Sequence, residues 1–199
     1  VAVDLALIRI ADRHPELALK VLARTRLADL PPQLERQRRI LEARSLIDAG
    51  REELALDLIS QLKGKDADYL RVDGYWKAKN YAQASELLEV LNTPASGAPQ
   101  MRQDARMSVV KAAVGFVLAG DKLGLSRLRS KFSEQMAQSA EWPLFEYVTR
   151  DIAPQSNEFR KLAQDIASAD SLDAFINSYR ELYGKAAELA PAKGGAPSA

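Results

Sequence analysis

The residue types that carry catalysis are sparse in this sequence. It has one histidine, His14, and no cysteine, so multi-histidine metal sites, thiolate metal sites and disulfides are all excluded. His14 stands directly before Pro15, a pairing that favours the start of a helix over a general base. The sequence therefore predicts no metal site.

Two Ser-x-x-Lys motifs, Ser60–Lys63 and Ser108–Lys111, have the spacing of a serine nucleophile and its lysine base. The companion motifs of serine acyl-transfer enzymes are missing, and no glycine-rich phosphate loop follows a predicted strand. The carboxylates fall mostly on polar helix faces or at helix starts, and none stands out as a catalytic pair. We therefore expect a protein that is not an enzyme and that needs no cofactor.

A closely spaced basic cluster is the strongest sequence argument for RNA binding. Its members are Arg36, Arg38, Arg39 and Arg44. Carboxylates on the same predicted helix lie close to them, namely Glu35, Glu42 and Asp48. Pairing at i, i+4 neutralises much of such charge, and 28 basic residues against 27 acidic ones leave a formal net charge of only +1. A solvated helix face is favoured over a nucleic-acid surface.

The elements that must position these residues are helices. Among the 199 residues, 47% are hydrophobic, with many Leu and Ala, and apolar residues recur at helical spacing. No apolar run reaches the roughly 18 residues of a membrane span. Helix pairs are expected at Ala2–Asp12 with Glu16–Ala28, Gln33–Ala49 with Glu52–Leu62, Ala67–Lys79 with Tyr81–Leu91, and Met101–Ala119 with Lys122–Gln138. The first helix of the last pair contains VVKAAVGFVLA and should be buried on both flanks.

The turns between paired helices share a pattern. An apolar residue lies four positions before the turn residue in three pairs: Leu46 before Gly50, Tyr75 before Lys79, and Phe116 before Gly120. A small residue often follows five positions after the turn, as at Ala18, Ala55 and Ala84, with Leu125 in the fourth pair. Intervals of about 30 to 40 residues with two helices per unit indicate a solenoid.

On these residues the chain resembles a tetratricopeptide repeat (TPR) array, most clearly in Tyr75–Leu88 and next in Leu46–Ile59. The family's early Trp is mostly missing, and its Pro after the second helix appears only as Pro31 and Pro94. The style of the sequence also resembles TPR-containing proteins of alphaproteobacteria. The resemblance covers about residues 2–138 and implies an all-α fold, a right-handed superhelix of antiparallel helix hairpins.

In that family the first helices line a concave groove for a peptide or helix, which implies a partner-binding site here. Carried over by position, the candidate groove residues are Gln37, Ile40, Arg44, Ile47, Asp48, Tyr69, Asp73, Trp76 and Lys77. The Lys and Asn that grip a chaperone's C-terminal carboxylate are absent, because those positions read Ile40, Arg44, Tyr69 and Asp73.

Residues 1–138 are thus predicted to hold about four repeats, and residues 139–185 to form C-terminal capping helices. Ser156 is a candidate cap for one of these helices, and Asp170 or Ser171 for the last. The stripe of Phe175, Tyr179 and Tyr183 is expected to be a lid over the open end of the array. Residues 186–199, rich in Ala, Pro and Gly, are predicted to be disordered.

The leading hypothesis is a non-enzymatic scaffold that binds a segment of another protein, with Arg44 and Trp76 as anchors whose joint replacement by Ala leaves the melting temperature nearly unchanged. The alternative is a helical accessory domain of a cell-envelope enzyme, similar to the α-superhelical regions of some lytic transglycosylases. RNA binding ranks third. The chain begins at Val1 without Met, which indicates a fragment or processed product and leaves a lost signal peptide or upstream repeats open. Cytoplasm or periplasm, and the oligomeric state, stay open too.

Overall fold

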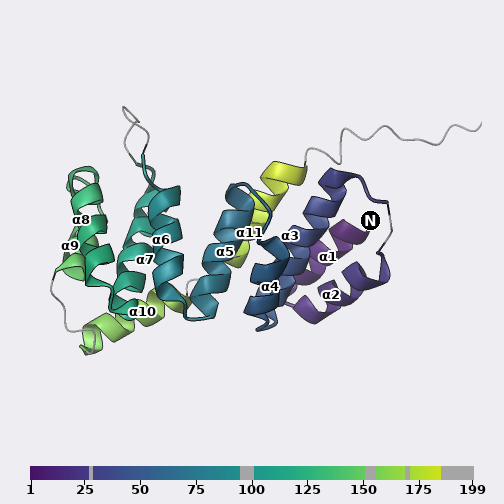
Figure 1. Cartoon of the computed structure of the whole chain (residues 1–199), viewed down its shortest axis with the longest axis horizontal. Helices are drawn as coiled ribbons and strands as arrows, with labels where there is room; N and C mark the ends of the chain where they lie inside the picture. Colours follow the sequence, from purple (N-terminus) through teal and green to yellow (C-terminus); the bar gives the residue numbers. More distant parts are fainter. Residues whose placement is uncertain (27–28, 95–100, 151–155, 169–170, 185–199) are drawn as a thin grey trace, which may run out of the picture.

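The computed structural model describes residues 1–26, 29–94, 101–150, 156–168 and 171–184. Within those ranges the protein is all-helical, as the sequence predicts. The predicted disordered tail and Asp170 lie outside the described residues. Side-by-side helices form an elongated row, with α5 near its middle (Figure 1).

Helix boundaries follow the sequence signals closely. The helices are α1 (Ala2–Ala11), α2 (Pro15–Arg24), α3 (Pro32–Asp48), α4 (Glu52–Ile59), α5 (Lys65–Lys77), α6 (Tyr81–Leu91), α7 (Gln103–Ala119), α8 (Lys122–Met136), α9 (Trp142–Thr149), α10 (Asn157–Ser168) and α11 (Leu172–Tyr179), which continues into a π-helical turn, η1 (Arg180–Gly184). From α1 to α8 each helix packs against the next one along the chain, and α3 also contacts α1 and α5.

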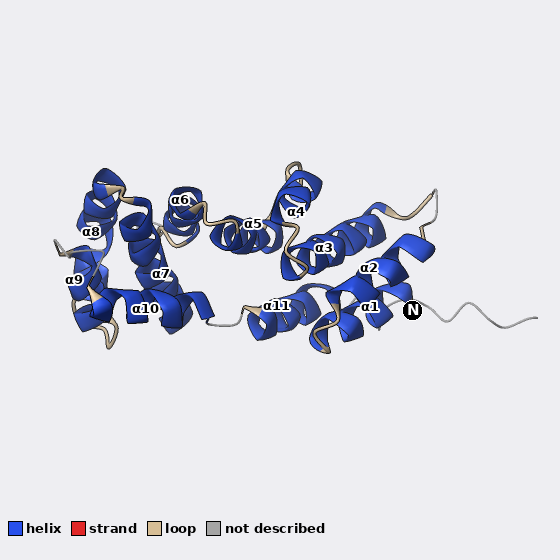
Figure 2. Ribbon diagram, turned by 90° about the horizontal axis from the view of Figure 1, so that it is seen from below, coloured by secondary structure: helices blue, strands red, loops and turns tan. Residues whose placement is uncertain are grey.

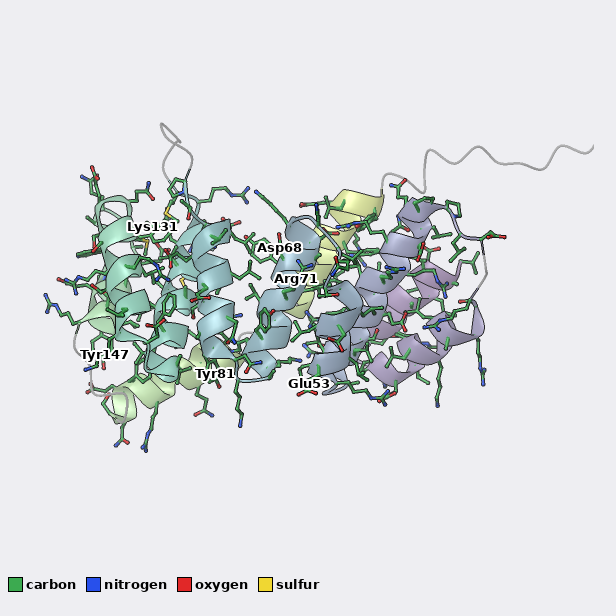
Figure 3. All side chains as sticks on the ribbon, viewed as in Figure 1. Glu53, Asp68, Arg71, Tyr81, Lys131 and Tyr147 are labelled. Carbon is green, nitrogen blue, oxygen red and sulfur yellow. The ribbon has the colours of Figure 1, made fainter. Side chains whose placement is uncertain are left out.

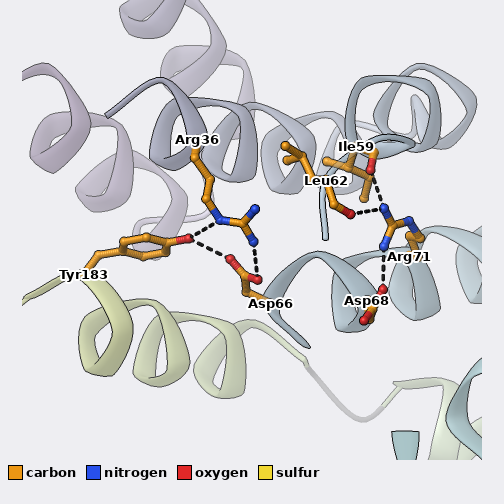
Figure 4. A network of polar contacts seen from close by, with 7 residues as sticks. All are labelled: Arg36, Ile59, Leu62, Asp66, Asp68, Arg71 and Tyr183. Atoms are coloured by element: carbon orange, nitrogen blue, oxygen red, sulfur yellow. Dashed lines mark hydrogen bonds and ion pairs between the residues drawn. The ribbon is translucent and has the colours of Figure 1, made fainter. Parts of the chain in front are cut away.

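Two helices end earlier than periodicity alone suggests, and arginines from neighbouring helices bind carbonyls near their ends. The guanidinium of Arg38 on α3 donates to the carbonyl of Leu22 near the end of α2. Arg71 on α5 donates to the carbonyl of Ile59, the last residue of α4, and to that of Leu62 beyond it (Figure 4). These bonds satisfy acceptors that a helix end leaves open.

The turns inside the four helix pairs (α1–α2, α3–α4, α5–α6 and α7–α8) share one geometry. Backbone φ is +73° at Gly50 and +69° at Gly120, and the non-glycine residues Arg13 and Lys79 adopt φ of 60° and 62° at the corresponding positions. In each turn the next N–H donates to the carbonyl five residues earlier, as from Asn80 to Tyr75 at 2.8 Å. This is the hydrogen bond of a Schellman C-cap. The predicted turn positions are therefore confirmed.

The small residues after the turns are fully buried between helices. Ala18, Ala55 and Ala84 are each 0% exposed. Helix α7 is buried from Val109 to Val117 except for the half-buried Lys111, because it packs between α6, α8 and α9. The prediction of a helix covered on both flanks is confirmed.

Two hydrophobic cores share α5. One core holds residues of α1 to α4 together with Ala67 and Leu70 from the first half of α5. The other holds residues of α6 to α9 together with Val72 and Trp76 from the second half of α5. Helix α5 is thus the joint between two packed halves of the molecule.

The C-terminal helices return along one side of this row (Figure 2). Helix α10 buries Phe159 in the core that surrounds α7. Helix α11 contacts α1 and buries Leu172, Ile176 and Tyr179 in the core of α1 to α4. Instead of covering an end of the row, as the sequence led us to expect, α10 and α11 run alongside it and join its two cores.

Candidate partner-binding face

The predicted groove residues lie on one face built by α3 and α5, and α11 lies against that face. Arg44, from α3, is 2% exposed and is held from several directions. Its guanidinium donates to Asp48 at 2.7 Å, to Asp73 at 3.3 Å and to the hydroxyl of Ser171 at 2.9 Å. The ring centroid of Phe175 on α11 is 5.3 Å from the Arg44 guanidinium carbon, in a cation–π contact.

Two lysines continue this network. Lys77 donates to Asp48 at 3.2 Å, and Lys111 of α7 lies 3.8 Å from Asp73. Together with Arg44 they link α3, α5 and α7 through alternating charges. Arg44 is therefore an internal connector between these helices and α11.

Trp76 is also internal. It is 7% exposed, its ring packs edge-on against Tyr81 at 5.3 Å between centroids, and Lys111 Nζ lies 4.8 Å from its ring centroid. Both anchors proposed from the sequence thus have their side chains committed within the chain. Because both side chains are buried, we now predict that their joint replacement by Ala destabilises the protein, contrary to the expectation from the sequence that the melting temperature stays nearly unchanged.

The other candidates divide by exposure. Ile40 and Ile47 are 0% and 1% exposed, and Gln37 is half-buried. Tyr69 is 43% exposed, and the side chain of Lys77 is 44% exposed. Only these last two candidates offer much free surface.

A cleft of about 490 Å³ opens between α5, α7 and α11–η1. Three of the nine predicted residues line it, namely Ile40, Tyr69 and Asp73. The walls from α7 include Asp104, Ala105, Ser108 and Lys111, and those from α11–η1 include Ala174, Phe175, Ser178 and Tyr179. A cleft of this size with apolar walls and a few polar groups has the character of a ligand site. Burial and the nearby Asp104 raise the pKa of Tyr69 above its ordinary value.

The sequence did not reveal which residues close the far side of the cleft. Phe175 and Tyr179 were recognised as an apolar stripe, but a stripe does not specify the surface that it covers. Ser171 was recognised as a helix cap, and it is the residue before α11. Its hydroxyl instead accepts the hydrogen bond from Arg44, whereas Ser156 caps α10 as predicted, accepting from the N–H of Phe159 at 3.2 Å.

A second polar cluster fixes the end of η1 against the same face (Figure 4). Arg36 donates to the hydroxyl of Tyr183 at 3.0 Å and to Asp66 at 2.6 Å, and that hydroxyl donates to Asp66 at 2.7 Å. Burial and the hydrogen bond to Asp66 raise the pKa of Tyr183. The three residues come from α3, α5 and η1, so this cluster ties the C-terminal segment to both helices.

The arginines that suggested an RNA surface point to separate partners. Arg39 pairs with Glu35 and Arg44 with Asp48, as i, i+4 spacing predicts. Arg38 is 8% exposed and bonds to α2, and Arg36 belongs to the Tyr183 cluster. Only Arg39, with a side chain 44% exposed, faces solvent to a large extent.

Within the described ranges, no group of three or more His, Cys, Asp or Glu residues is placed to hold a metal ion. Among the same residues, no helix has the length and apolar character needed to cross a bilayer.

Comparison with known proteins adds no relative, since no family model, no curated protein and no solved structure matches this chain.

Proposed function

We propose that this protein is a non-enzymatic scaffold that binds a helix or extended segment of another protein on the face formed by α3, α5 and α7. The cleft of about 490 Å³ on this face carries the proposal. It offers apolar walls for an anchoring side chain, and Tyr69 lies at its exposed margin.

The repeated helix pairs support a TPR-like interpretation. In each of the four pairs, the turn between the helices has one residue in the left-handed conformation and the same backbone hydrogen bond. A recurrent turn of this kind is what a structural repeat requires. We propose that the pairs form a solenoid whose first helices present the binding face.

Site-specific photocrosslinking tests the proposal. A photoreactive phenylalanine analogue at Tyr69 should form a discrete covalent adduct with one partner protein in cells that make the full-length protein. The same analogue at Leu54, which is 58% exposed on α4 and does not line the cleft, is the control and should give no such adduct.

A matched pair of substitutions shows whether the cleft itself is used. Ser108→Trp places an indole in the cleft from α7 and should abolish the Tyr69 adduct. Ser126→Trp on exposed α8 surface should leave the adduct intact. An adduct that survives Ser108→Trp, in a protein of unchanged helicity, would contradict binding in the cleft.

A further inference from the structure

We propose that α11–η1 is a self-ligand of this face, and that the partner is an amphipathic helix with the same apolar stripe, which replaces it. The inference rests on the proposed function and names the class of partner. It follows from the contacts that α11–η1 makes, from the ion pairs that α3 and α5 retain when α11–η1 detaches, and from the cleft beside it.

The seated segment is a one-sided helix. Leu172, Ile176 and Tyr179 are 4%, 7% and 6% exposed, and Phe175 and Tyr183 are partly buried beside them. Between these residues the segment exposes mainly polar or small residues, namely Asp173, Ala174, Asn177, Ser178, Arg180 and Glu181, together with the 56% exposed Leu182. Spacings of three, four and seven residues are those by which a helix docks into a groove.

We call the surface of α3 and α5 that α11–η1 contacts, with Arg36, Arg44 and Asp66, the seat. Its charged side chains stay paired when α11–η1 detaches. Arg36 and Asp66 bond directly at 2.6 Å, independently of Tyr183. Arg44 retains Asp48 and Asp73 after it loses Ser171 and Phe175. Undocking therefore leaves no buried charge without a counter-charge, which is the usual barrier to opening a polar interface.

One contact of the docked segment is unfavourable. The hydroxyl of Tyr179 is buried without a hydrogen-bond partner in the described part of the chain. A buried hydroxyl without a hydrogen-bond partner weakens the docked state relative to the undocked one. The cleft shows in addition that α11–η1 fills the face only in part.

The seat defines the chemistry of the partner helix. To replace Ser171 and Phe175 in their contacts with Arg44, the partner helix needs an acceptor oxygen at its start and an aromatic ring one turn later. Arg36 and Asp66 call for a hydroxyl that both accepts and donates, the place of Tyr183. A helix with these groups and a larger apolar residue toward the cleft gains contacts that α11 lacks.

A labelled synthetic peptide of residues 171–184 serves as the probe and the full-length protein as the receptor. Wild-type protein should bind the peptide weakly, because its own α11–η1 competes at high effective concentration. Tyr183→Phe removes the hydroxyl that bonds to Arg36 and Asp66 and should tighten peptide binding about tenfold by raising the open fraction.

Tyr147→Phe is the matched control. Its hydroxyl bonds to Glu158 at 3.3 Å, and Tyr147 lies near the end of the row occupied by α8 and α9 (Figure 3). This variant should bind the peptide as the wild type does. A peptide with Phe175 and Tyr179 replaced by Ser should bind none of the proteins.

Hydrogen exchange provides the second readout. Amides of residues 172–184 should exchange faster in Tyr183→Phe, while those of α3 keep their wild-type protection. Equal peptide affinity for wild type and Tyr183→Phe, or unchanged exchange at residues 172–184, would overturn the self-ligand. If either negative result is obtained but the Tyr69 adduct still forms, the proposed function stands. If Tyr183→Phe binds the peptide more tightly but no adduct forms, the proposed function is contradicted and the self-ligand is supported.

Discussion

At the residue scale, the face is organised by buried charges whose partners come from different helices. Arg44 connects α3 to α5 through Asp73 and to α11 through Ser171 and Phe175. The resemblance to TPR proteins implied that Arg44 lines the groove, but it could not show that α11 would lie against Arg44. A residue predicted to contact a partner protein contacts the chain's own C-terminal segment instead.

Arg44→Ala should lower the free energy of unfolding by about 3 kcal/mol, because it removes the cation between two carboxylates that are largely buried. Urea denaturation measures the loss. Arg39→Ala, which removes an exposed i, i+4 pair, should change stability by less than about 0.5 kcal/mol. Equal effects of the two substitutions would show that Arg44 is solvated in the native protein.

Glu89 should make stability depend on acid pH. Burial of its carboxyl raises the pKa, but hydrogen bonds from Arg127 and Lys131 outweigh burial and hold the pKa below the ordinary value. The ionised Glu89 therefore contributes its full share to the free energy of unfolding above the unfolded pKa of about 4.3, and this contribution is lost as the pH falls through the folded pKa.

Glu89→Gln measures this contribution. It should cost about 1–2 kcal/mol at pH 7, since Arg127 remains half exposed and regains water. The difference from wild type should begin to shrink as the pH falls below about 5 and should keep shrinking as the pH falls through the lowered pKa of folded Glu89. A difference that stays constant over that fall in pH would contradict the pairing.

At the element scale, close helix contacts and turns were the features most readable from sequence. Spacing alone identified the turn residues Gly50, Lys79 and Gly120 and the alanines that follow two of them. It could do so because the turn geometry and close packing restrict which residue types fit there. The partners of each helix were less readable, since an apolar stripe fits many surfaces.

Gly115 allows α7 to approach α6. A Cβ at this position would lie 2.2 Å from Ser85 Oγ, 3.0 Å from Trp76 Cζ3 and 3.3 Å from the carbonyl oxygen of Tyr81. Gly115→Ala should therefore destabilise the protein by about 2–3 kcal/mol, despite the better helix propensity of Ala. Thermal and urea unfolding measure the change.

Ser85→Ala provides the internal check on this contact. The Ser85 hydroxyl is buried and has no hydrogen-bond partner in the described ranges, so its removal alone should be nearly neutral or slightly stabilising. In the double variant Gly115→Ala/Ser85→Ala most of the loss should be recovered. Strictly additive effects would mean that the two helices do not meet at these atoms.

Lys79 occupies a turn position with φ of 62°, where a side chain is strained. Lys79→Gly should stabilise the protein by about 0.5–1 kcal/mol. This is the strain relieved at the left-handed position, reduced by the larger backbone entropy that Gly loses on folding. Ala78→Gly, at φ of −71°, should instead cost about 0.5–1 kcal/mol. Two losses of equal size would contradict the left-handed geometry at Lys79.

At the scale of the whole molecule, α10 and α11 join the two cores that meet at α5. The sequence predicted these helices as terminal caps because their amphipathic pattern is that of any helix needing one apolar neighbour. Their actual course depends on side chains separated by more than a hundred residues, such as Asp66 and Tyr183. Local pattern cannot encode such a pairing.

The course of α10 and α11 also limits the surface that is open on the proposed binding face. The open part of the face is the cleft, and the covered part is the seat of α11–η1. The partner helix that we propose would occupy both parts and gain a continuous surface across α3, α5 and α7. Binding and release of the C-terminal segment are then two sides of one equilibrium.

Hydrogen exchange of the full-length protein, with and without the partner identified by crosslinking at Tyr69, tests this account most directly. Two opposite changes are predicted: amides of α5 and the first half of α7 become protected, while those of residues 172–184 exchange faster. Protection confined to α4, α6 and α8, or protection of residues 172–184 together with the face, would contradict it.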